Sequence, residues 1–193
     1  VQQRITMESH PDLLNLLKAA RERRNFKVDE WIDQKTDMLN DYMRKCGLKA
    51  CVVSVSGGID SACTLGICLA AKAKKDSPIQ KVLGIAQPIR STASIWQRAL
   101  ECKETMGADI VVVDQTEVFP QIATAVETAT GIPGEPFAQG QLKSYMRTPV
   151  GYYAAQLISQ AGMPCIVMGT GNFDEDGYLC YFCKAGDGIV DVQ

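Results

Sequence analysis

A glycine pair between a strand-like run and a helix-like run is the feature that most restricts how this chain can fold. The run Ala50–Val55 is apolar and rich in β-branched residues, and the residues from Ala62 to Ala73 are small and mostly apolar. A strand, a tight turn at Gly57-Gly58 and a helix start would direct backbone N–H groups toward one point, where an anion can bind. We therefore predict a phosphate-binding loop, with an ordinary strand-to-helix turn as the alternative.

The residues of this loop indicate which ligands it would bind. No Gly-Lys-Ser/Thr follows the glycines, so the loop is not a Walker-type P-loop. Asp60 stands in the first helical turn instead, and a carboxylate beside a polyphosphate needs a cation between the two charges, which indicates Mg²⁺. The alternative is an acid that is stabilised by the helix dipole. The hydroxyls of Ser56 and Ser61 could add hydrogen-bond donors at the rim.

Strands and helices are predicted to alternate along most of the chain. Three further strands are expected at Lys81–Ala86, Asp109–Val113 and Pro164–Met168. Helices are expected at Pro11–Arg24, Asp29–Cys46, Thr92–Met106, Val118–Thr128 and Leu142–Ala161, with Gly47 and Gly107 ending two of them, a loop at Gly131–Pro136 and a kink or break at Pro149. The alternation predicts an α/β fold, a doubly wound, Rossmann-like parallel sheet with helices on both faces in a single domain.

Ligands of such sheets bind at the carboxyl ends of the strands. The Gly57-Gly58 loop follows the first strand, Gln87–Arg90 follows the second, and Gly169–Asn172 follows the fourth. We therefore expect these three loops to converge at one edge of the sheet.

Composition and charge exclude several classes of protein. The 193 residues suit one domain, and their formal net charge of -2 argues against nucleic-acid binding. No apolar run is long enough to cross a membrane, the start has no signal-peptide core, and the eight cysteines are mostly scattered among apolar residues. We expect a soluble cytoplasmic protein. Cys180 and Cys183 lack the second pair that a zinc site would need, so a metal or redox role is disfavoured there.

The loop Ser56–Ser61 resembles the Ser-Gly-Gly-x-Asp-Ser loop of the ATP pyrophosphatases, which adenylate a substrate and release pyrophosphate. This group includes GMP synthetase, asparagine synthetase and NAD synthetase. The segment 169–191 is more specific, because its Gly-Thr-Gly-Asn, acidic, Tyr-Phe-x-Lys and Gly-Asp-Gly-x-x-Asp elements are similar to the NAD synthetase pattern. Gly140–Arg147 and Pro88–Thr92 also resemble this family, and the resemblance covers about residues 29–193.

The resemblance to NAD synthetases implies a ligase that forms a C–N bond, amidating deamido-NAD with ammonia and ATP through an adenylated intermediate. It implies that Asp60 and Glu175 hold Mg²⁺ and that Lys184 neutralises charge on the substrate. The residues expected to bind ATP are Ser54, Val55, Ser56, Gly57, Gly58, Ile59, Asp60, Ser61, Arg90 and Thr170. The residues expected to bind deamido-NAD are Tyr145, Arg147, Lys184 and Asp191. Their alternatives are a solvated acid for Glu175, a loop-end cap for Thr170, and a surface ion pair for Lys184 and Asp191.

The sequence departs from the family pattern at two places. Tyr145 stands where the family often carries an arginine, so the substrate contact would be a stacked ring or would pass to Arg147. One extra residue lies between Glu175 and Lys184. The resemblance also implies a homodimer, a synthetase domain at residues 29–193 after a helical segment at residues 1–28, and a chain that ends before the family's C-terminal part.

Two other functions remain open at this point. One is another amidating ATP pyrophosphatase such as GMP synthetase, and the other is a nucleotide-binding α/β module without turnover. No glutaminase domain precedes the loop, which implies the use of free ammonia unless a partner delivers it. In the implied reaction the first nucleophile belongs to the substrate, so catalysis would depend on positioning and charge stabilisation.

Overall fold

The computed structural model describes residues 10–180, 183–186 and 188–193. It divides into two compact units, Val1–Lys35 and Thr36–Gln193, and the boundary falls inside a helix. The start of the predicted N-terminal segment, residues 1–9, lies outside the described residues, as do the motif residues Tyr181, Phe182 and Asp187.

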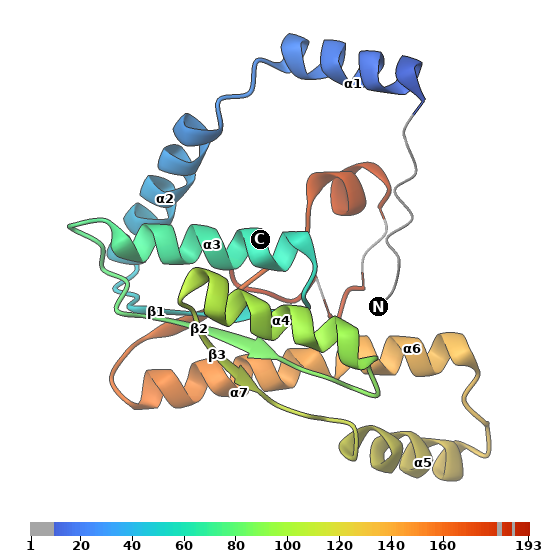
Figure 1. Ribbon diagram of the computed structural model, residues 1–193. Coiled ribbons are helices and arrows are strands. Elements are labelled where there is room, and N and C mark those ends of the chain that lie inside the picture. The colour runs from blue at the N-terminus through green and yellow to red at the C-terminus, as the bar shows by residue number, and fades with distance from the viewer. Residues whose placement is uncertain (1–9, 181–182, 187) are drawn as a thin grey trace. The chain divides into compact units, whose positions relative to one another are not determined.

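The second unit is built on a parallel sheet of four strands in the order β3-β2-β1-β4 (Figure 1). The strands are β1 (Ala50–Ser54), β2 (Lys81–Ala86), β3 (Asp109–Val112) and β4 (Cys165–Met168). All four predicted strands are confirmed, with ends that differ from the prediction by at most one residue.

Seven α-helices are present in the described residues, and none of these has the length and hydropathy that a bilayer crossing requires. They are α1 (Pro11–Arg24), α2 (Val28–Lys45), α3 (Ile59–Ala73), α4 (Ala93–Met106), α5 (Val118–Thr130), α6 (Pro136–Tyr145) and α7 (Arg147–Gln160). Gly47 and Gly107 follow α2 and α4 with φ of 68° and 64°, the left-handed conformation that ends many helices.

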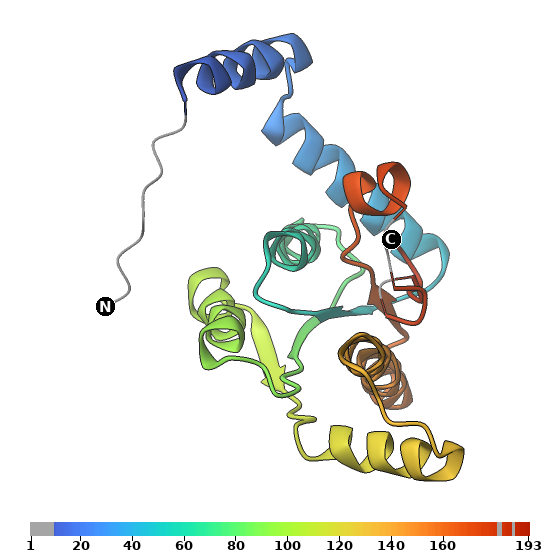
Figure 2. The same ribbon diagram turned by 90° about the vertical axis from the view of Figure 1, so that its right-hand side faces the viewer.

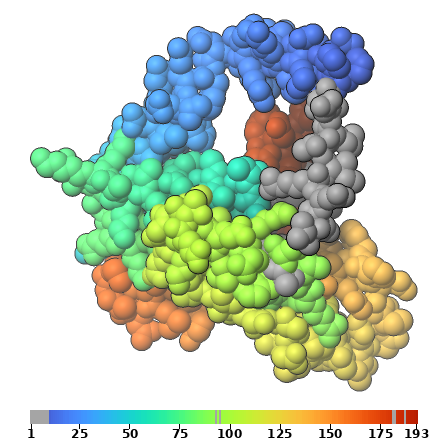
Figure 3. Space-filling view, viewed as in Figure 1, coloured from blue at the N-terminus to red at the C-terminus, as the bar shows by residue number. Residues whose placement is uncertain are grey.

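Helices cover both faces of the sheet, as the doubly wound prediction requires. Helices α3 and α4 pack on one face and α7 on the other (Figure 2), and the atoms of α3 and α4 adjoin on the face of the molecule that Figure 3 shows. Alternate residues of β1 point to opposite faces of the sheet. Val53 lies in the apolar cluster that contains Leu65 of α3, whereas Val52 packs with Ala155 of α7. Burial on both faces explains why β1 is a continuous apolar run.

The helix predicted at Leu142–Ala161 is instead two helices, which corrects the sequence prediction. The break lies at Met146, between α6 and α7, and not at Pro149. Pro149 lies in the first turn of α7, where a backbone N–H has no partner within the helix, so a proline is tolerated there. Pro136, predicted to lie in a loop, begins α6, because its fixed φ suits the first position of a helix.

The sheet order places a switch point next to β1. The chain runs from β1 to β2 and β3 on one side, and then returns to β4 on the other side of β1. In open parallel sheets the crevice at the carboxyl ends of such neighbouring strands is where ligands bind. The loops after β1 and β4 are therefore the first place to look for a site.

Candidate functional site

The glycine-rich loop lies at the surface, beyond the carboxyl end of β1. The N–H of Val55 still donates to Ile85 of β2 at 2.8 Å, so the loop starts from a fixed point. Gly57 has a φ of 84°, which glycine adopts without strain. Gly58 and Ile59 are exposed, and no side chain caps the start of α3. The first N–H groups of α3 therefore have no partner within the helix, as a phosphate-binding loop requires.

The hydroxyls of Ser56 and Ser61 stabilise this loop through hydrogen bonds to its own backbone. Ser61 Oγ donates to the carbonyl of Gly58 at 3.1 Å and accepts from the N–H of Ser56 at 3.2 Å. Ser56 Oγ accepts from the N–H of Gly58 at 3.2 Å. Ser61 is buried and Ser56 is exposed. Ser61 thus shapes the loop from inside, while Ser56 is the serine that lies at the rim.

Asp60 meets the loop that follows β4. Asn172 Nδ2 donates to Asp60 Oδ1 at 3.3 Å, across 112 positions of sequence. One turn later in α3, the hydroxyl of Thr64 donates to the carbonyl of Gly169 at 3.3 Å. Helix α3 and the loop after β4 are therefore joined at the switch point, which confirms the expected convergence for two of the three loops, those after β1 and β4.

Glu175 lies in a single turn of π-helix, η1 (Phe173–Tyr178), where the sequence suggested a loop. Asn172 caps this turn, because its Oδ1 accepts from the N–H of Glu175 at 3.0 Å. The side chain of Glu175 is exposed. The structure thus links Glu175 to Asp60 through the side chain of Asn172.

The donor set at Asp60 fits a hard cation such as Mg²⁺. Within the described residues Asp60 Oδ2 accepts no hydrogen bond, so this oxygen is available as a ligand. No group of three or more His, Cys, Asp or Glu side chains that could hold a metal occurs in that part of the chain. Mg²⁺ commonly takes one or two carboxylates and completes its shell with water and phosphate oxygens. Asp60 with phosphate and water oxygens therefore forms a suitable ligand set, to which Glu175 could add.

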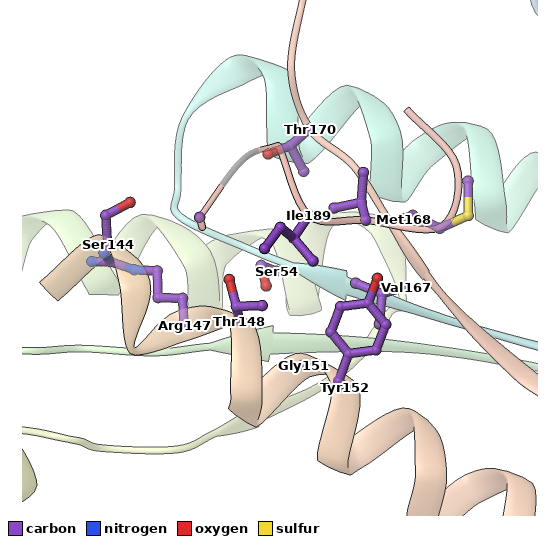
Figure 4. Close-up of a pocket in the computed structure, with 12 residues that line it drawn as sticks. Ser54, Ser144, Arg147, Thr148, Gly151, Tyr152, Val167, Met168, Thr170 and Ile189 are labelled. Carbon is purple, nitrogen blue, oxygen red and sulfur yellow. The ribbon is translucent and has the colours of Figure 1, made fainter. Parts of the chain in front are cut away.

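Two adjoining cavities open at the carboxyl ends of the strands. A cavity of about 50 Å³ is bounded by Ser54, Thr170 and the start of α7, and Figure 4 shows Thr170 and Arg147 on either side of Ser54. A second, of about 120 Å³, lies between the ends of β1 and β2. Ser54 and Arg147 line both cavities. The first cavity therefore brings Ser54 and Thr170, expected to bind ATP, together with Arg147, which is expected to bind the substrate. The second brings Ser54, Val55 and Ser56 together with the same arginine.

Two buried glutamines form a hydrogen-bonded chain at the strand ends, where Gln87 lines the second cavity, and the sequence did not predict this chain. Gln87 Nε2 donates to Ser54 Oγ at 3.1 Å, and Gln87 Oε1 accepts from Gln115 Nε2 at 2.9 Å. Both glutamines are buried. They connect the carboxyl ends of β1, β2 and β3. The available signal was a polar side chain placed directly after an apolar strand, as Gln87 is after β2.

Tyr145 and Arg147 lie in different places. Tyr145 is 43% exposed and lines a separate cavity of about 360 Å³ between α5 and α6. Arg147 lines both strand-end cavities and donates to the carbonyl of Lys143 at 2.9 Å. Of the two expected substrate contacts, Arg147 is therefore the one at the strand ends.

Asp191 is bound to strand β4. Its Oδ2 accepts from the N–H of Val167 at 2.7 Å, and its own N–H donates to the carbonyl of Val167 at 3.0 Å. Its Oδ1 accepts from the hydroxyl of Tyr152 at 3.3 Å. Burial is the largest cause that raises the pKa of Tyr152, and the charge of Asp191 raises this pKa further.

Lys184 is exposed and forms no ion pair with any residue that the structure describes.

Arg90 lies just after β2 with an uncommon backbone conformation, and two contacts fix its position. Its φ of 52° is uncommon for a residue with a side chain, and its N–H donates to Thr116 Oγ1 at 3.1 Å. Its guanidinium carbon lies 5.4 Å from the centre of the buried Phe119 ring. Lys143 Nζ lies 5.3 Å from the same ring centre. Cation–π attraction thus holds two positive charges beside the end of β2.

Comparison with known proteins identifies the family. A model of the NAD synthase family matches residues 31–193. An NH(3)-dependent NAD(+) synthetase of Methanococcoides burtonii is 34% identical over 158 residues, which is 81% of this chain and 55% of that protein. One of Mesoplasma florum is 30% identical over 166 residues, 86% of this chain and 63% of that protein. The chain thus spans less than two thirds of the length of these relatives.

Solved structures share the fold. An NMN synthetase from Francisella tularensis superposes with a TM-score of 0.72 at 21% identity, over 86% of this chain and 63% of that chain. An NH3-dependent NAD synthetase from Campylobacter jejuni superposes with a TM-score of 0.72 at 17% identity, over 86% of this chain and 66% of that chain. The match of the family model over most of the residues, together with the shared fold, shows that the chain belongs to the NAD synthase family.

Proposed function

We propose that this protein amidates deamido-NAD to NAD, with ammonia as the nitrogen donor and ATP as the co-substrate. Family membership and the names of its NH(3)-dependent relatives support this reaction. The observation that carries the proposal is the contact between Asp60 and Asn172. It brings the Ser-Gly-Gly-x-Asp-Ser loop and the Gly-Thr-Gly-Asn loop, two elements of the family pattern, into one site.

The proposed reaction has two steps. The nicotinate carboxylate attacks the α-phosphorus of ATP, an O–P bond forms, and the bond to the bridging oxygen breaks to release pyrophosphate. Ammonia then attacks the acyl carbon and loses a proton to solvent. The bond between the acyl carbon and the oxygen of the adenylate breaks, and AMP leaves with that oxygen. Because the first nucleophile belongs to the substrate, the protein has to align the reactants and stabilise the developing charge.

The chain's own groups have separate tasks in this scheme. The free N–H groups at the start of α3, and Ser56 at the rim, hold the departing pyrophosphate. Asp60 and Glu175 would hold Mg²⁺, which when bound neutralises phosphate charge. Ser54, Thr170 and the Arg90 side chain line the path of ATP.

The substrate side of the site is proposed from the strand-end cavities. Arg147 takes the contact that the family pattern gives to the position of Tyr145, since it lines the same cavity as Thr170. Lys184 supplies positive charge to the substrate. Asp191 fixes its own segment of chain beside β4. The remaining lone pairs of its carboxylate can accept hydrogen bonds from the substrate.

The setting of the enzyme is also proposed. Residues 29–193 would form the synthetase domain after a helical segment at residues 1–28, and the family resemblance favours a homodimer. All eight cysteines are free thiols, which suits a reducing compartment such as the cytoplasm.

Replacement of Asp60 tests the proposal. Asp60→Asn keeps an oxygen for the hydrogen bond from Asn172 but removes the negative charge, so we expect NAD formation from deamido-NAD, ATP and ammonia to fall on the order of 100-fold. The melting temperature should change little, because Asp60 is only half-buried. The matched control is Asp41→Asn, which neutralises an exposed acid of α2 that pairs with Arg44 at 2.7 Å. Wild-type turnover in Asp60→Asn would contradict the metal role.

The choice of acceptor separates the alternatives. Deamido-NAD, nicotinic acid mononucleotide and xanthosine monophosphate are supplied in turn with ATP and ammonia, and pyrophosphate release is measured. We expect release with deamido-NAD. Release with xanthosine monophosphate alone would indicate a GMP synthetase, and release with the mononucleotide alone would indicate an activity like that named for the Francisella protein. No release with any acceptor, together with ATP binding, would indicate a module without turnover.

A further inference from the structure

The side chain of Asn172 makes two hydrogen bonds, one as a donor and one as an acceptor. Its Nδ2 donates to Asp60 Oδ1 at 3.3 Å, and its Oδ1 accepts from the N–H of Glu175 at 3.0 Å. The first partner is a carboxylate and can only accept, and the second is a backbone N–H and can only donate. A side-chain amide carries both a donor and an acceptor, so it satisfies both at once. The carboxylate of Asp60 and the backbone of Glu175 are therefore held by a single side chain.

The backbone of Asn172 is itself fixed. Its carbonyl accepts from the N–H of Asp176 at 2.9 Å, and it is the N-cap residue of η1. Gln193 Nε2 donates to Asp176 Oδ2 at 2.6 Å over Gly171, where a Cβ would overlap both side chains. Any larger residue at position 171 would have to displace this hydrogen-bonded pair of side chains. Asn172 is thus anchored from the β4 side and presents its amide to α3.

The contact also determines which oxygen of Asp60 is available. Asn172 occupies Oδ1, and Oδ2 accepts no hydrogen bond within the described residues. A donor fixed on one carboxylate oxygen restricts rotation of the group and leaves the other oxygen to bind a ligand. Hydrogen-bond partners of metal-binding carboxylates act in this way, and their loss typically lowers metal affinity 10–100-fold.

We propose that Asn172 is a positioning residue that orients Asp60 relative to Glu175 and thereby sets the affinity of the site for a divalent cation bound with ATP. This inference rests on the proposed metal role of the two acids. It gives Asn172 a task of its own, since the family resemblance assigned ligands on either side of this residue but no role to its side chain.

The test measures metal binding without turnover. Mn²⁺ serves as the probe, and its free-ion electron paramagnetic resonance signal is titrated with protein in the presence of α,β-methylene ATP, which cannot release pyrophosphate. In Asn172→Ser the hydroxyl can still cap the N–H of Glu175, but it is too short to reach Asp60. We expect about 10-fold weaker Mn²⁺ binding in this variant, with an unchanged melting temperature.

Two further variants separate positioning from folding. Asn172→Leu loses both hydrogen bonds, so Mn²⁺ binding and the melting temperature should both fall. Thr64→Val removes the other tie between α3 and the β4 loop, the 3.3 Å bond to Gly169, without touching either acid. Its Mn²⁺ affinity should equal that of the wild type. Equal Mn²⁺ affinity in wild type and Asn172→Ser would overturn the inference.

Parallel activity measurements distinguish this inference from the proposed function. If the wild type forms NAD and Asn172→Ser binds Mn²⁺ normally, the inference alone fails. If the wild type forms no NAD but Asn172→Ser weakens Mn²⁺ binding, the positioning role stands and the proposed function fails. If the wild type adds nothing to the Mn²⁺ binding of the ATP analogue itself, the metal role and this inference fail together.

Discussion

At the scale of single residues, burial divides the cysteines into two chemical groups. Burial is the main cause that raises the pKa of Cys165 to about 12, from an ordinary value of 9.0. The pKa of Cys51 is also raised, first by a hydrogen bond with Cys68 and then by burial. Cys46 and Cys63, in contrast, are exposed. Because the thiolate is the reactive form, the two groups should differ in alkylation.

We expect iodoacetamide at pH 8 to modify Cys46 and Cys63 and to spare Cys165 and Cys51. With a pKa of about 12, only on the order of one Cys165 side chain in ten thousand is a thiolate at pH 8. Folding favours the neutral thiol, so this stabilisation is present below pH 9.0 and is lost as the pH rises toward about 12. Labelling of Cys165 should therefore increase over that range.

Mass spectrometry of the digested protein measures the labelling of each cysteine. The control is the same reaction in guanidinium chloride, where all eight cysteines should be modified. Labelling of Cys165 in the folded protein as fast as that of Cys63 would show that its pKa is not raised.

At the scale of elements, two glycines inside regular structure have opposite surroundings. A Cβ at Gly84 of β2 would lie 2.9 Å from Cγ1 of Ile110 and 3.1 Å from Cγ2 of Val55. A Cβ at Gly66 of α3 would have no such neighbour within 4 Å. Gly84 allows β2 to pack closely against Ile110 and Val55. Gly66 allows no closer packing and only gives the unfolded chain more backbone freedom, which the helix loses on folding.

The same substitution should therefore have opposite effects at these two positions. We expect Gly84→Ala to lower the free energy of unfolding by about 1–3 kcal/mol, because the core around Ile110 is overpacked. We expect Gly66→Ala to raise it by about 0.5–1 kcal/mol, because alanine favours the helix. Urea unfolding curves measure both changes. Equal effects of the two substitutions would mean that packing at Gly84 does not limit stability.

At the scale of the whole molecule, the two units differ in burial. None of the described residues 10–35 is buried, and α1 contains no buried residue. The apolar clusters, which include Val53, Val52 and Phe119, draw all their buried members from residues 36–193. The stability of the second unit should therefore come from its own core.

A chain that begins at Val28 tests this expectation. We expect its free energy of unfolding to agree with that of the whole chain within about 0.5 kcal/mol, because none of the described residues that it lacks, 10–27, is buried, and changes away from the core usually stay within that range. Thermal or urea denaturation of the two proteins makes the comparison. A loss well above 1 kcal/mol would mean that the first unit contributes to the core.

The sequence by itself determined the strands, the parallel sheet and the place of the glycine-rich loop. The strands could be predicted because both faces of β1 are buried, which requires an unbroken apolar run. Gly107 marked the end of α4 because its φ of 64° suits glycine. These features depend on neighbouring residues and on a simple pattern of burial, and both can be read from a local stretch of chain.

Only the tertiary structure decided how the site is joined. The contact of Asp60 with Asn172 and the Gln87–Gln115 amide chain depend on strand order. The presence of Arg147, and not Tyr145, at the strand ends goes with the break at Met146. A local pattern does not encode which side chains meet across 112 positions of sequence. The return of the chain to place β4 beside β1 brings these residues together, because parallel neighbours end at the same edge of the sheet.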